Sequence, residues 1–381
     1  MVLTTLAAAA AVLWTGILLA PWRAWSTREQ LDGGSDSPAG SATADCSGVT
    51  ALIPARDEAA VIGNTITALR AQGTGLDIVV IDDQSDDGTA DVARAAGGAS
   101  CRVIAGSPLP AGWVGKMWAL EQGRHHVRTP LALLLDADIE LRPGILAALL
   151  ARRRLDGRQL LSLMAVLEMG STWDKLLVPA FVYFFKLLYP FRISNSPSRL
   201  VAAAAGGCVL VDTGMLEQIG GFAAIRDELI DDCALARRIK SAGGRTWIGL
   251  THSAVSRRRL ATLRASWRMV ARSAFAQLRF SALLLACCVA LLAVAFWAAP
   301  LAMITGPTAA RWLAAIASAA MITSYIPVLR FYGRSPLWAL ALPVTGTLYL
   351  LMTVSSAIRS WRGVRATWKG RAYDGAMHPR A

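Results

Sequence analysis

The clearest candidate chemistry in this chain lies in the segment LLLDADIEL. Asp136 and Asp138 stand one residue apart, directly after the apolar run at 130–135. Carboxylate oxygens are the ligands that Mg²⁺ and Mn²⁺ prefer, and such ions commonly take further ligands from substrate phosphates. Two aspartates at this spacing also arise by chance. Their place at the end of an apolar run favours a site for Mg²⁺ or Mn²⁺.

Two other acidic clusters also follow apolar runs. Asp57 and Glu58 come after VTALIP, and Asp83 comes after DIVVID. A carboxylate at a strand end can accept a hydrogen bond from a nucleobase or a ribose hydroxyl, as in other nucleotide-binding folds. Two structural explanations stay open, an acidic helix start at Asp57 and Glu58 and an Asx-turn after Asp83.

A fourth acidic pair, Asp231 and Asp232, begins the segment DDCALARRIKSAGG, whose spacing predicts an amphipathic helix ending at Gly243. A carboxylate there could take a proton from an acceptor hydroxyl as a general base. The alternative is that both acids stabilise the helix dipole.

Two isolated residues could support these acids. Lys116 follows Gly115 at a predicted helix start, where a cation and backbone N–H groups can meet a phosphate. His252, in the predicted strand TWIGLTHSAV, could be a third protein ligand of the metal. A hydrogen-bonded histidine on an edge strand explains it equally well.

The elements that must position these residues alternate along the chain. From Val49 onward, short apolar runs are followed by helical patterns four times in succession. This alternation predicts an α/β domain over 49–272 with a doubly wound parallel sheet, whose ligands bind at the carboxyl ends of the strands. The Gly- and Ser-rich stretch at 24–48 predicts a flexible linker before it.

The remaining chain is apolar, and 54% hydrophobic residues with a mean hydropathy of +0.43 exceed what a purely soluble protein carries. We expect a retained transmembrane anchor at 1–23 and two to three membrane helices within 273–358. The candidate spans are 281–299, 308–329 and 336–357. The aromatic segment 172–192 contains Lys186 and two prolines. It predicts an interfacial membrane helix, or else a buried helix of the domain.

The net charge of +13 comes from basic residues that flank the apolar segments. This placement follows the positive-inside rule and favours contact with anionic membrane lipids over nucleic acid. One conflict remains. Three full spans after a cytoplasmic domain would place the basic tail at 359–381 on the outer side, so one segment is expected to be re-entrant or interfacial.

Taken in order, the motifs PARDE, DDQSDDGT, GKMWAL, DAD and IDDCALARR resemble those of family-2 glycosyltransferases with the GT-A fold. PAFVYFFKLLYPF and NSPSRLVAAAAGGC are similar to segments of bacterial hopene-associated glycosyltransferases, relatives of ceramide glucosyltransferases. The resemblance implies a multi-pass protein of the bacterial inner membrane with a cytoplasmic catalytic domain. Its expected substrates are a nucleoside-diphosphate sugar, with a UDP-sugar first, and a lipid acceptor in hopanoid or related glycolipid metabolism.

The same resemblance implies residue roles. Asp232 would be the base of an inverting transfer, beside Asp231. Asp136 and Asp138 would hold the metal and the donor diphosphate. The other expected donor contacts are Asp57, Glu58 and Asp83 to the nucleoside, Lys116 to the diphosphate or sugar, and Gly206 and Gly207, where the backbone approaches the donor sugar.

Three other functions are weighed against single-sugar transfer. A processive polysaccharide synthase would carry Gln-x-x-Arg-Trp, and the corresponding stretch Met269–Ser273 retains only Arg272. A nucleotidyltransferase would carry a Gly-rich basic loop after the first strand, whereas PARDEAAVIG has none. An inactive membrane scaffold would not be expected to keep every one of the acidic motifs.

Overall fold

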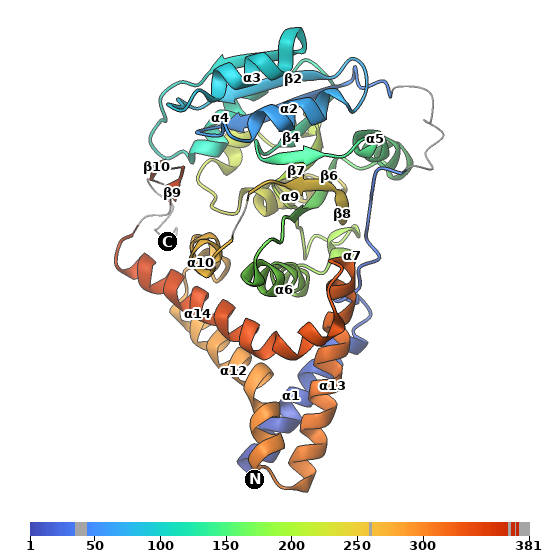
Figure 1. Ribbon diagram of the computed structural model, residues 1–381, viewed down its shortest axis with the longest axis vertical. Coiled ribbons are helices and arrows are strands. Elements are labelled where there is room, and N and C mark those ends of the chain that lie inside the picture. The colour runs from blue at the N-terminus through green and yellow to red at the C-terminus, as the bar shows by residue number, and fades with distance from the viewer. Residues whose placement is uncertain (35–43, 259–260, 365–366, 370, 373–381) are drawn as a thin grey trace.

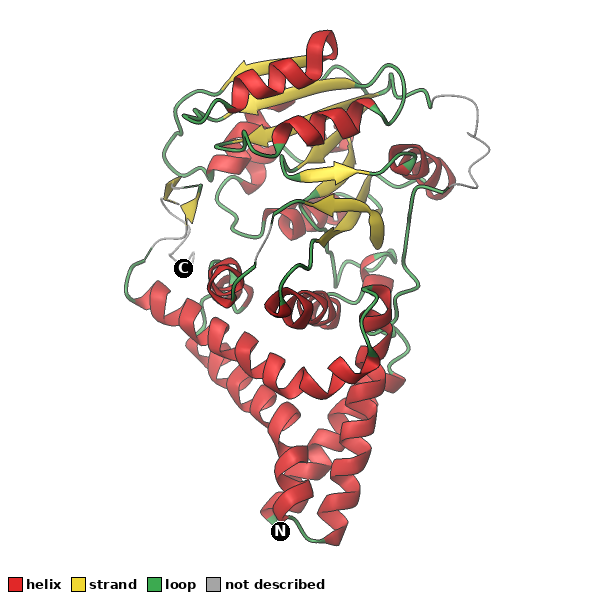
Figure 2. Cartoon of the chain, viewed as in Figure 1, coloured by secondary structure: helices red, strands yellow, loops and turns green. Residues whose placement is uncertain are grey.

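The computed structural model of the chain describes residues 1–34, 44–258, 261–364, 367–369 and 371–372. An eight-stranded sheet flanked by helices forms one end, and long helices extend from the other (Figure 1). The strand order is β3-β2-β1-β4-β7-β6-β8-β5. Figure 2 shows the main sheet at the wide end and only helices in the narrow extension.

Half of the sheet is parallel, as predicted. Its strands are β1 (Val49–Ala55), β2 (Asp77–Asp82), β3 (Cys101–Ala105) and β4 (Leu131–Leu135). Every residue of β1 and of β4 is buried. Continuous burial is typical of parallel strands covered by helices on both faces, and it explains their unbroken apolar runs.

The other half corrects the prediction of a wholly parallel sheet. Strand β7 (Cys208–Asp212) is antiparallel to both β4 and β6 (Leu160–Leu167), and β8 (Thr246–Ser256) is parallel to β6. Strand β5 (Ile139–Leu141) begins only three residues after β4 and pairs antiparallel with β8. A parallel crossover needs a dozen or more residues, so β5 cannot return beside β4 in the same direction.

Helices cover both faces of the sheet and enclose two hydrophobic cores. One core joins the sheet to α2 (Ile62–Arg70), α3 (Thr89–Gly97) and α5 (Ile145–Asp156). The other joins it to α4 (Gly115–Arg124), α8 (Thr213–Gln218), the 3₁₀ turn η2 (Phe222–Ile225) and α9 (Asp231–Ser241). The acidic pair thus begins α9, as its spacing predicted.

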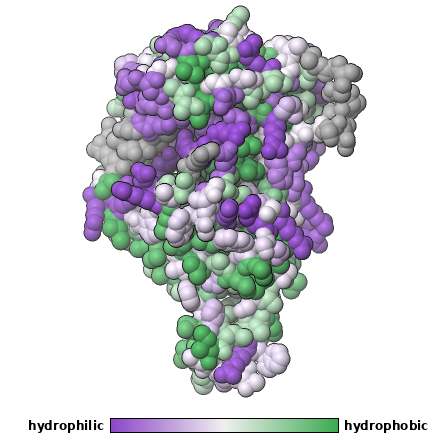
Figure 3. Space-filling model, in the orientation of Figure 1, coloured by the Kyte–Doolittle hydropathy of each residue, from purple (hydrophilic) through white to green (hydrophobic). Residues whose placement is uncertain are grey.

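In the described part of the chain, four helices are long and apolar enough to cross a membrane. They are α1 (Val2–Leu19), α12 (Ala282–Thr305), α13 (Thr308–Phe331) and α14 (Leu342–Trp361), the last counted with the preceding 3₁₀ turn η3 (Pro336–Ala341). Figure 3 shows a mostly polar surface over the sheet domain and mainly apolar or neutral residues over the narrow end. The protein is therefore membrane-associated.

The four helices do not run alike. Helices α1, α12 and α13 form the narrow bundle, whereas α14 crosses between this bundle and the sheet domain (Figure 1). Within the bundle, Trp14 donates from Nε1 to the carbonyl of Ala295 at 2.8 Å. Ala7, Ala10 and Ala314 are fully buried. Small residues of this kind let membrane helices approach closely.

Shorter helices lie between the domain and the bundle: α6 (Thr172–Leu188), α7 (Phe191–Ser194), α10 (Leu263–Ala271) and α11 (Ala274–Gln277). Helix α6, expected as an interfacial segment or a buried helix, packs on α13 and α14. Its Tyr183 hydroxyl lies 2.7 Å from Ser324 Oγ, and its Leu177 carbonyl accepts from the Tyr349 hydroxyl at 2.9 Å.

The predicted flexible linker at 24–48 needs correction in its described parts. Leu250 is bonded to the connector on either side of Gln30, because its N–H donates to the Glu29 carbonyl and its own carbonyl accepts from the Leu31 N–H. The Asp32 carboxylate accepts from the hydroxyl of Thr251, the backbone of His252 and the hydroxyl of Ser253. The connector is thus bound to β8; residues 35–43 lie outside the described residues.

Candidate active site

Asp136 and Asp138 lie where β4 ends, and their surroundings differ. Asp136 forms an ion pair of 2.7 Å with Lys116 and is about one-third exposed. Asp138 is buried; its Oδ2 accepts from Ser256 Oγ at 2.6 Å, and its Oδ1 lies 3.6 Å from the Arg258 guanidinium. Both carboxylates therefore lie at the carboxyl edge of the sheet, as the sequence predicted, each with its own partners.

Lys116 joins this pair to the acids of α9. Its Nζ lies 3.7 Å from Asp231 and 3.5 Å from the Gly206 carbonyl. Burial alone would lower the pKa of Lys116, but Asp136, Asp231 and Asp232 outweigh it and hold that pKa above its ordinary value. The ammonium is thus a fixed positive charge among three carboxylates.

Asp232 is held by backbone N–H groups on both of its oxygens. Gly206 donates to Oδ2 at 2.8 Å, and Cys233 donates to Oδ1 at 2.7 Å. Burial and the neighbouring charge of Asp231 nevertheless raise the pKa of Asp232 to about 6, because they outweigh these bonds and the Lys116 cation. A carboxylate with such a pKa can accept a proton near neutral pH.

The glycine pair brings backbone against these groups. A Cβ on Gly206 would lie 3.3 Å from Lys116 Nζ and 3.4 Å from Asp232, and a Cβ on Gly207 would lie 3.3 Å from Ile139. Gly207 also accepts from the Asp136 N–H at 3.1 Å. Lys116, Asp136, Gly206, Asp231 and Asp232 line one pocket between α4, the end of β4 and the start of α9.

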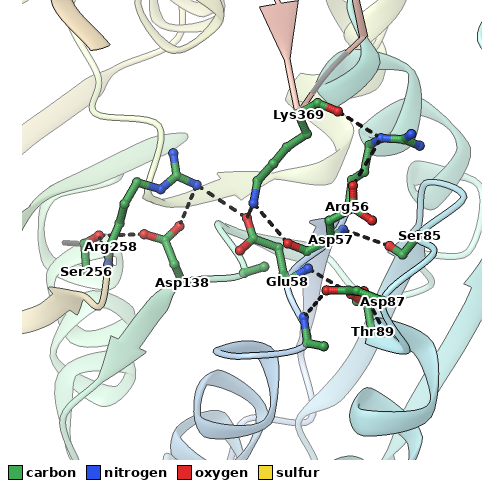
Figure 4. Close-up of polar contacts among 12 residues, drawn as sticks. Arg56, Asp57, Glu58, Ser85, Asp87, Thr89, Asp138, Ser256, Arg258 and Lys369 are labelled. Carbon is green, nitrogen blue, oxygen red and sulfur yellow. Dashed lines mark hydrogen bonds and ion pairs between the residues drawn. The ribbon is translucent and has the colours of Figure 1, made fainter. Parts of the chain in front are cut away.

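Asp57 and Glu58 lie in the loop after β1, which is bonded to the loop after β2 (Figure 4). Asp57 donates from its backbone to Ser85 Oγ at 3.0 Å, and Glu58 donates to Thr89 Oγ1 at 2.8 Å. Asp57 is exposed and has a positive φ of 50°, which aspartate tolerates better than most residues. Asp83, in the second loop, is fully buried.

Glu58 is the centre of a second charged cluster. Its Oε1 lies 2.8 Å from Lys369 Nζ and 3.4 Å from the Arg258 guanidinium. Burial raises the pKa of Glu58, and the nearby Asp138 adds to the effect, although both cations oppose it. Figure 4 shows a series of ion pairs of alternating charge that joins Lys369, Glu58, Arg258 and Asp138 in this order.

His252 is not brought to the aspartate pair. Its Nδ1 lies 3.2 Å from Asp32, its Nε2 lies 2.9 Å from the Phe331 carbonyl, and its ring stacks on Phe331 at 4.1 Å. It is also four residues from Ser256 on β8, or about 13 Å at the usual rise of a strand. These contacts match the alternative of a hydrogen-bonded strand histidine.

The remaining donor set still suits a hard divalent cation. In the part of the chain that the structure describes, no three His, Cys, Asp or Glu side chains cluster as a metal site. Mg²⁺ and Mn²⁺ are commonly held by one or two carboxylates together with substrate phosphates. Asp136 and Asp138 could supply those two carboxylates.

Sequence reasoning missed Arg258 and Lys369 as neighbours of the site. Both belong to basic stretches that flank apolar segments, and the charge pattern assigned them to the membrane surface. Nothing in the local sequence distinguishes these two side chains from the other arginines and lysines there, because their contacts with Glu58 join residues 200 and 311 positions apart.

Curated relatives resemble part of this chain. A 4,4'-diaponeurosporenoate glycosyltransferase from Staphylococcus aureus (strain MRSA252) is 35% identical over 112 residues, and the protein of that name from strain USA300 is 34% identical over 112 residues. Each match covers 29% of this chain and 29% of the relative, so the chain matches less than a third of their length.

A solved structure resembles nearly all of it. The mannosyltransferase from Pyrobaculum calidifontis, in complex with GDP-Man and Mn²⁺, superposes with a TM-score of 0.54 at 18% identity, over 94% of this chain and 98% of the other. At this identity the likeness establishes the fold alone. Residues 47–276, more than half of the chain, match the family described as Glycosyltransferase like family 2. This chain therefore belongs to glycosyltransferase family 2, with a GT-A domain joined to long apolar helices.

Proposed function

We propose that this protein is an inverting glycosyltransferase that moves one sugar from a nucleoside-diphosphate sugar, a UDP-sugar first, to a hydroxyl of a membrane lipid. The observation that carries the proposal is the single pocket shared by Asp136, Lys116 and Asp232. It combines the Asp136 carboxylate for a metal-bound diphosphate, the Lys116 cation, and a proton acceptor, Asp232, whose pKa is raised.

In the proposed reaction the acceptor hydroxyl oxygen bonds to the anomeric carbon as the bond from that carbon to the diphosphate breaks. The hydroxyl proton passes to Asp232, and the nucleoside diphosphate leaves. Asp136 and Asp138 would hold Mg²⁺ or Mn²⁺, which would offset the charge of the leaving diphosphate. Attack on the face of the anomeric carbon opposite the leaving diphosphate inverts the anomeric configuration. A positioned base raises the rate roughly 10²–10⁴-fold.

A lipid acceptor is supported by what surrounds the base. Tyr189, at the end of α6, donates from its hydroxyl to Gln277 of α11 at 2.7 Å. Burial, with the neighbouring Cys233 and Asp232, raises the pKa of Tyr189 to about 12. Tyr189 also packs against the apolar cluster that contains Cys233, the residue after Asp232, so the helices between domain and bundle reach the start of α9. A hydroxyl-bearing lipid of hopanoid or related glycolipid metabolism is the first candidate acceptor, and an apolar carboxylate like diaponeurosporenoate, which would not need a base, is the second.

We further propose that α1, α12 and α13 span the inner membrane while α14 lies in its interface. Eighteen residues of α1 correspond to about 27 Å, close to the thickness of a bilayer core. Exposed apolar residues recur along η3 and α14 at helical spacing, forming one stripe: Leu337, Leu340, Val344, Leu351, Ile358 and Trp361.

This arrangement removes the conflict in the charge pattern. When α1, α12 and α13 are the only spans, the side of the membrane that holds the catalytic domain also holds Arg23, Arg330, Arg362 and the tail. Positive charge is favoured on the cytoplasmic side, so the catalytic domain is proposed to be cytoplasmic.

The test incubates membranes carrying the protein with a panel of radiolabelled sugar nucleotides, followed by lipid extraction. Label is expected in one lipid with the wild type and is lost in Asp232→Asn. Asp91→Asn is the matched control, because Asp91 is exposed on α3 and pairs only with Arg94 among the described residues. It should retain wild-type labelling.

The products separate the other functions. Release of nucleoside diphosphate supports sugar transfer, whereas pyrophosphate would indicate a nucleotidyltransferase. One sugar per lipid supports single transfer, and a ladder of longer products would indicate a processive synthase. No labelled lipid from any donor, with folded protein in the membrane, would favour an inactive scaffold.

A further inference from the structure

The chain returns to the catalytic domain after its last long helix. Strands β9 (Thr367–Trp368) and β10 (Arg371–Ala372) pair antiparallel, and Lys369 lies in the turn between them. Figure 1 shows these strands beside the sheet domain, beyond the end of α14. Lys369 Nζ donates to the Asp57 carbonyl at 3.2 Å and pairs with Glu58 at 2.8 Å.

The turn is held by its backbone as well as by its ammonium. Arg56 donates from Nε to the Lys369 carbonyl at 3.2 Å. The same guanidinium donates to the carbonyls of Asp83, at 2.5 Å, and Gln84, at 3.0 Å. Arg56 therefore binds the tail to the loop after β2, on the edge where the nucleoside is expected (Figure 4).

Charge explains why a cation is needed there. Asp57, Glu58 and Asp138 lie at this edge with Arg258 as the other cation beside the last two, and a nucleoside diphosphate would bring further negative charge. Lys116 forms ion pairs with Asp136 and Asp231 in the pocket beside α9, and among the described residues it forms none with Glu58. Lysine suits the task because its ammonium is a point charge on a flexible stem and can exchange a carboxylate for a phosphate.

We propose that Lys369 is a donor-binding residue: the turn that carries Lys369 completes the nucleotide end of the active site, and the Lys369 ammonium binds the diphosphate of the donor. This inference rests on the proposed function, since it requires a nucleoside-diphosphate donor. It also requires the tail to share a side of the membrane with the catalytic domain, which the three-span arrangement provides.

The experiment measures binding of UDP and of GDP, each with Mg²⁺, to the full-length protein in detergent by calorimetry. Lys369→Ala is expected to weaken binding of the preferred nucleotide about tenfold, the loss of one charge-assisted hydrogen bond. Lys369→Arg keeps the charge and is expected to stay within about threefold of the wild type. Arg362→Ala is the matched control, because Arg362 is an exposed basic residue at the end of α14 with no described side-chain contact; it should leave binding unchanged.

Steady-state transfer supplies the second readout. A raised KM for the donor with kcat retained supports the assignment. Equal or tighter nucleotide binding by Lys369→Ala would overturn it, and tighter binding would identify the tail as a plug of the site. If the wild type binds neither nucleotide, the proposed function fails together with this inference. If nucleotide binds but no lipid is labelled, only the proposed acceptor fails.

Discussion

The backbone N–H of Gly206 donates a 2.8 Å hydrogen bond to Oδ2 of Asp232. The segment that leads into β7 thus fixes the position of the proposed base. The absence of a side chain at 206 makes this approach possible, because a Cβ would lie 3.3 Å from Lys116 Nζ. A cation, a base and a backbone donor therefore depend on one another's placement.

Gly206→Ala should lower kcat about tenfold with little change in protein stability, because the Lys116 ammonium must move by a few tenths of an ångström and the new methyl group would touch Asp232. Transfer kinetics in membranes would measure it. Gly170→Ala is the matched control, since a Cβ there meets nothing within 4 Å. Wild-type kcat in Gly206→Ala would show that this packing does not position the base.

The rate should depend on pH through Asp232. Its pKa of about 6 lies above the ordinary value, so the reactive carboxylate predominates above pH 6, and kcat should fall towards tenfold per unit below it. Asp231→Asn removes a negative neighbour and should move the acid limb of the kcat profile to lower pH. An acid limb that stays in place would exclude Asp232 as the titrating group.

Lys116→Gln should raise the KM for the donor and destabilise the protein by about 1–3 kcal/mol, because Asp136, Asp231 and Asp232 would lose their shared cation. Thermal unfolding in detergent and donor kinetics would report the two effects. Loss of the cation should also move the acid limb of the profile to higher pH. Unchanged melting would mean that solvent compensates these carboxylates.

Chelation by EDTA should abolish transfer, and Mg²⁺ or Mn²⁺ should restore it. Because only two protein carboxylates are expected to hold the ion, Mn²⁺ should bind weakly alone and at least tenfold more tightly with the preferred nucleoside diphosphate. Electron paramagnetic resonance would measure free Mn²⁺. Asp138→Asn should lose this enhancement and Asp91→Asn should keep it; strong Mn²⁺ binding without nucleotide would contradict the two-carboxylate site.

Alkaline phosphatase fusions should distinguish three spans from four, because the enzyme is active only outside the cytoplasm. A fusion at Gly306, in the turn between α12 and α13, should be active, and fusions after Gln277 and after Arg362 should be inactive. Activity after Arg362 would make α14 a fourth span and would separate Lys369 from Glu58.

The sequence predicted the elements whose cause is local. The buried runs of β1, β2 and β4 indicated parallel strands, and the acids at their ends were placed on the correct edge. The antiparallel half of the sheet was missed, because apolar runs such as that of β7 carry no mark of direction. The three-residue strand β5 was also missed, because it is too short to show an apolar pattern of its own.

The candidate site could likewise be predicted only where its residues belong to local sequence motifs. Asp136, Lys116 and Asp232 belong to motifs of fixed order, and the structure gathers them in one pocket. Lys369 and Arg258 were assigned to the membrane surface, because a basic tail predicts lipid contact and its return to Glu58 depends on tertiary structure. His252 was predicted as a metal ligand from its residue type alone. Its partners in the structure are Asp32 of the connector and the Phe331 carbonyl at the end of α13.

That connector has a consequence for acceptor selection. Asp32 is bonded to three consecutive residues of β8, and the His252 ring joins the same strand to the end of α13. If α1, α12 and α13 span the membrane as proposed, a domain fastened in this way would hold Asp232 at a fixed height above the bilayer. The enzyme would then select acceptor lipids by the distance at which their hydroxyl projects from the membrane.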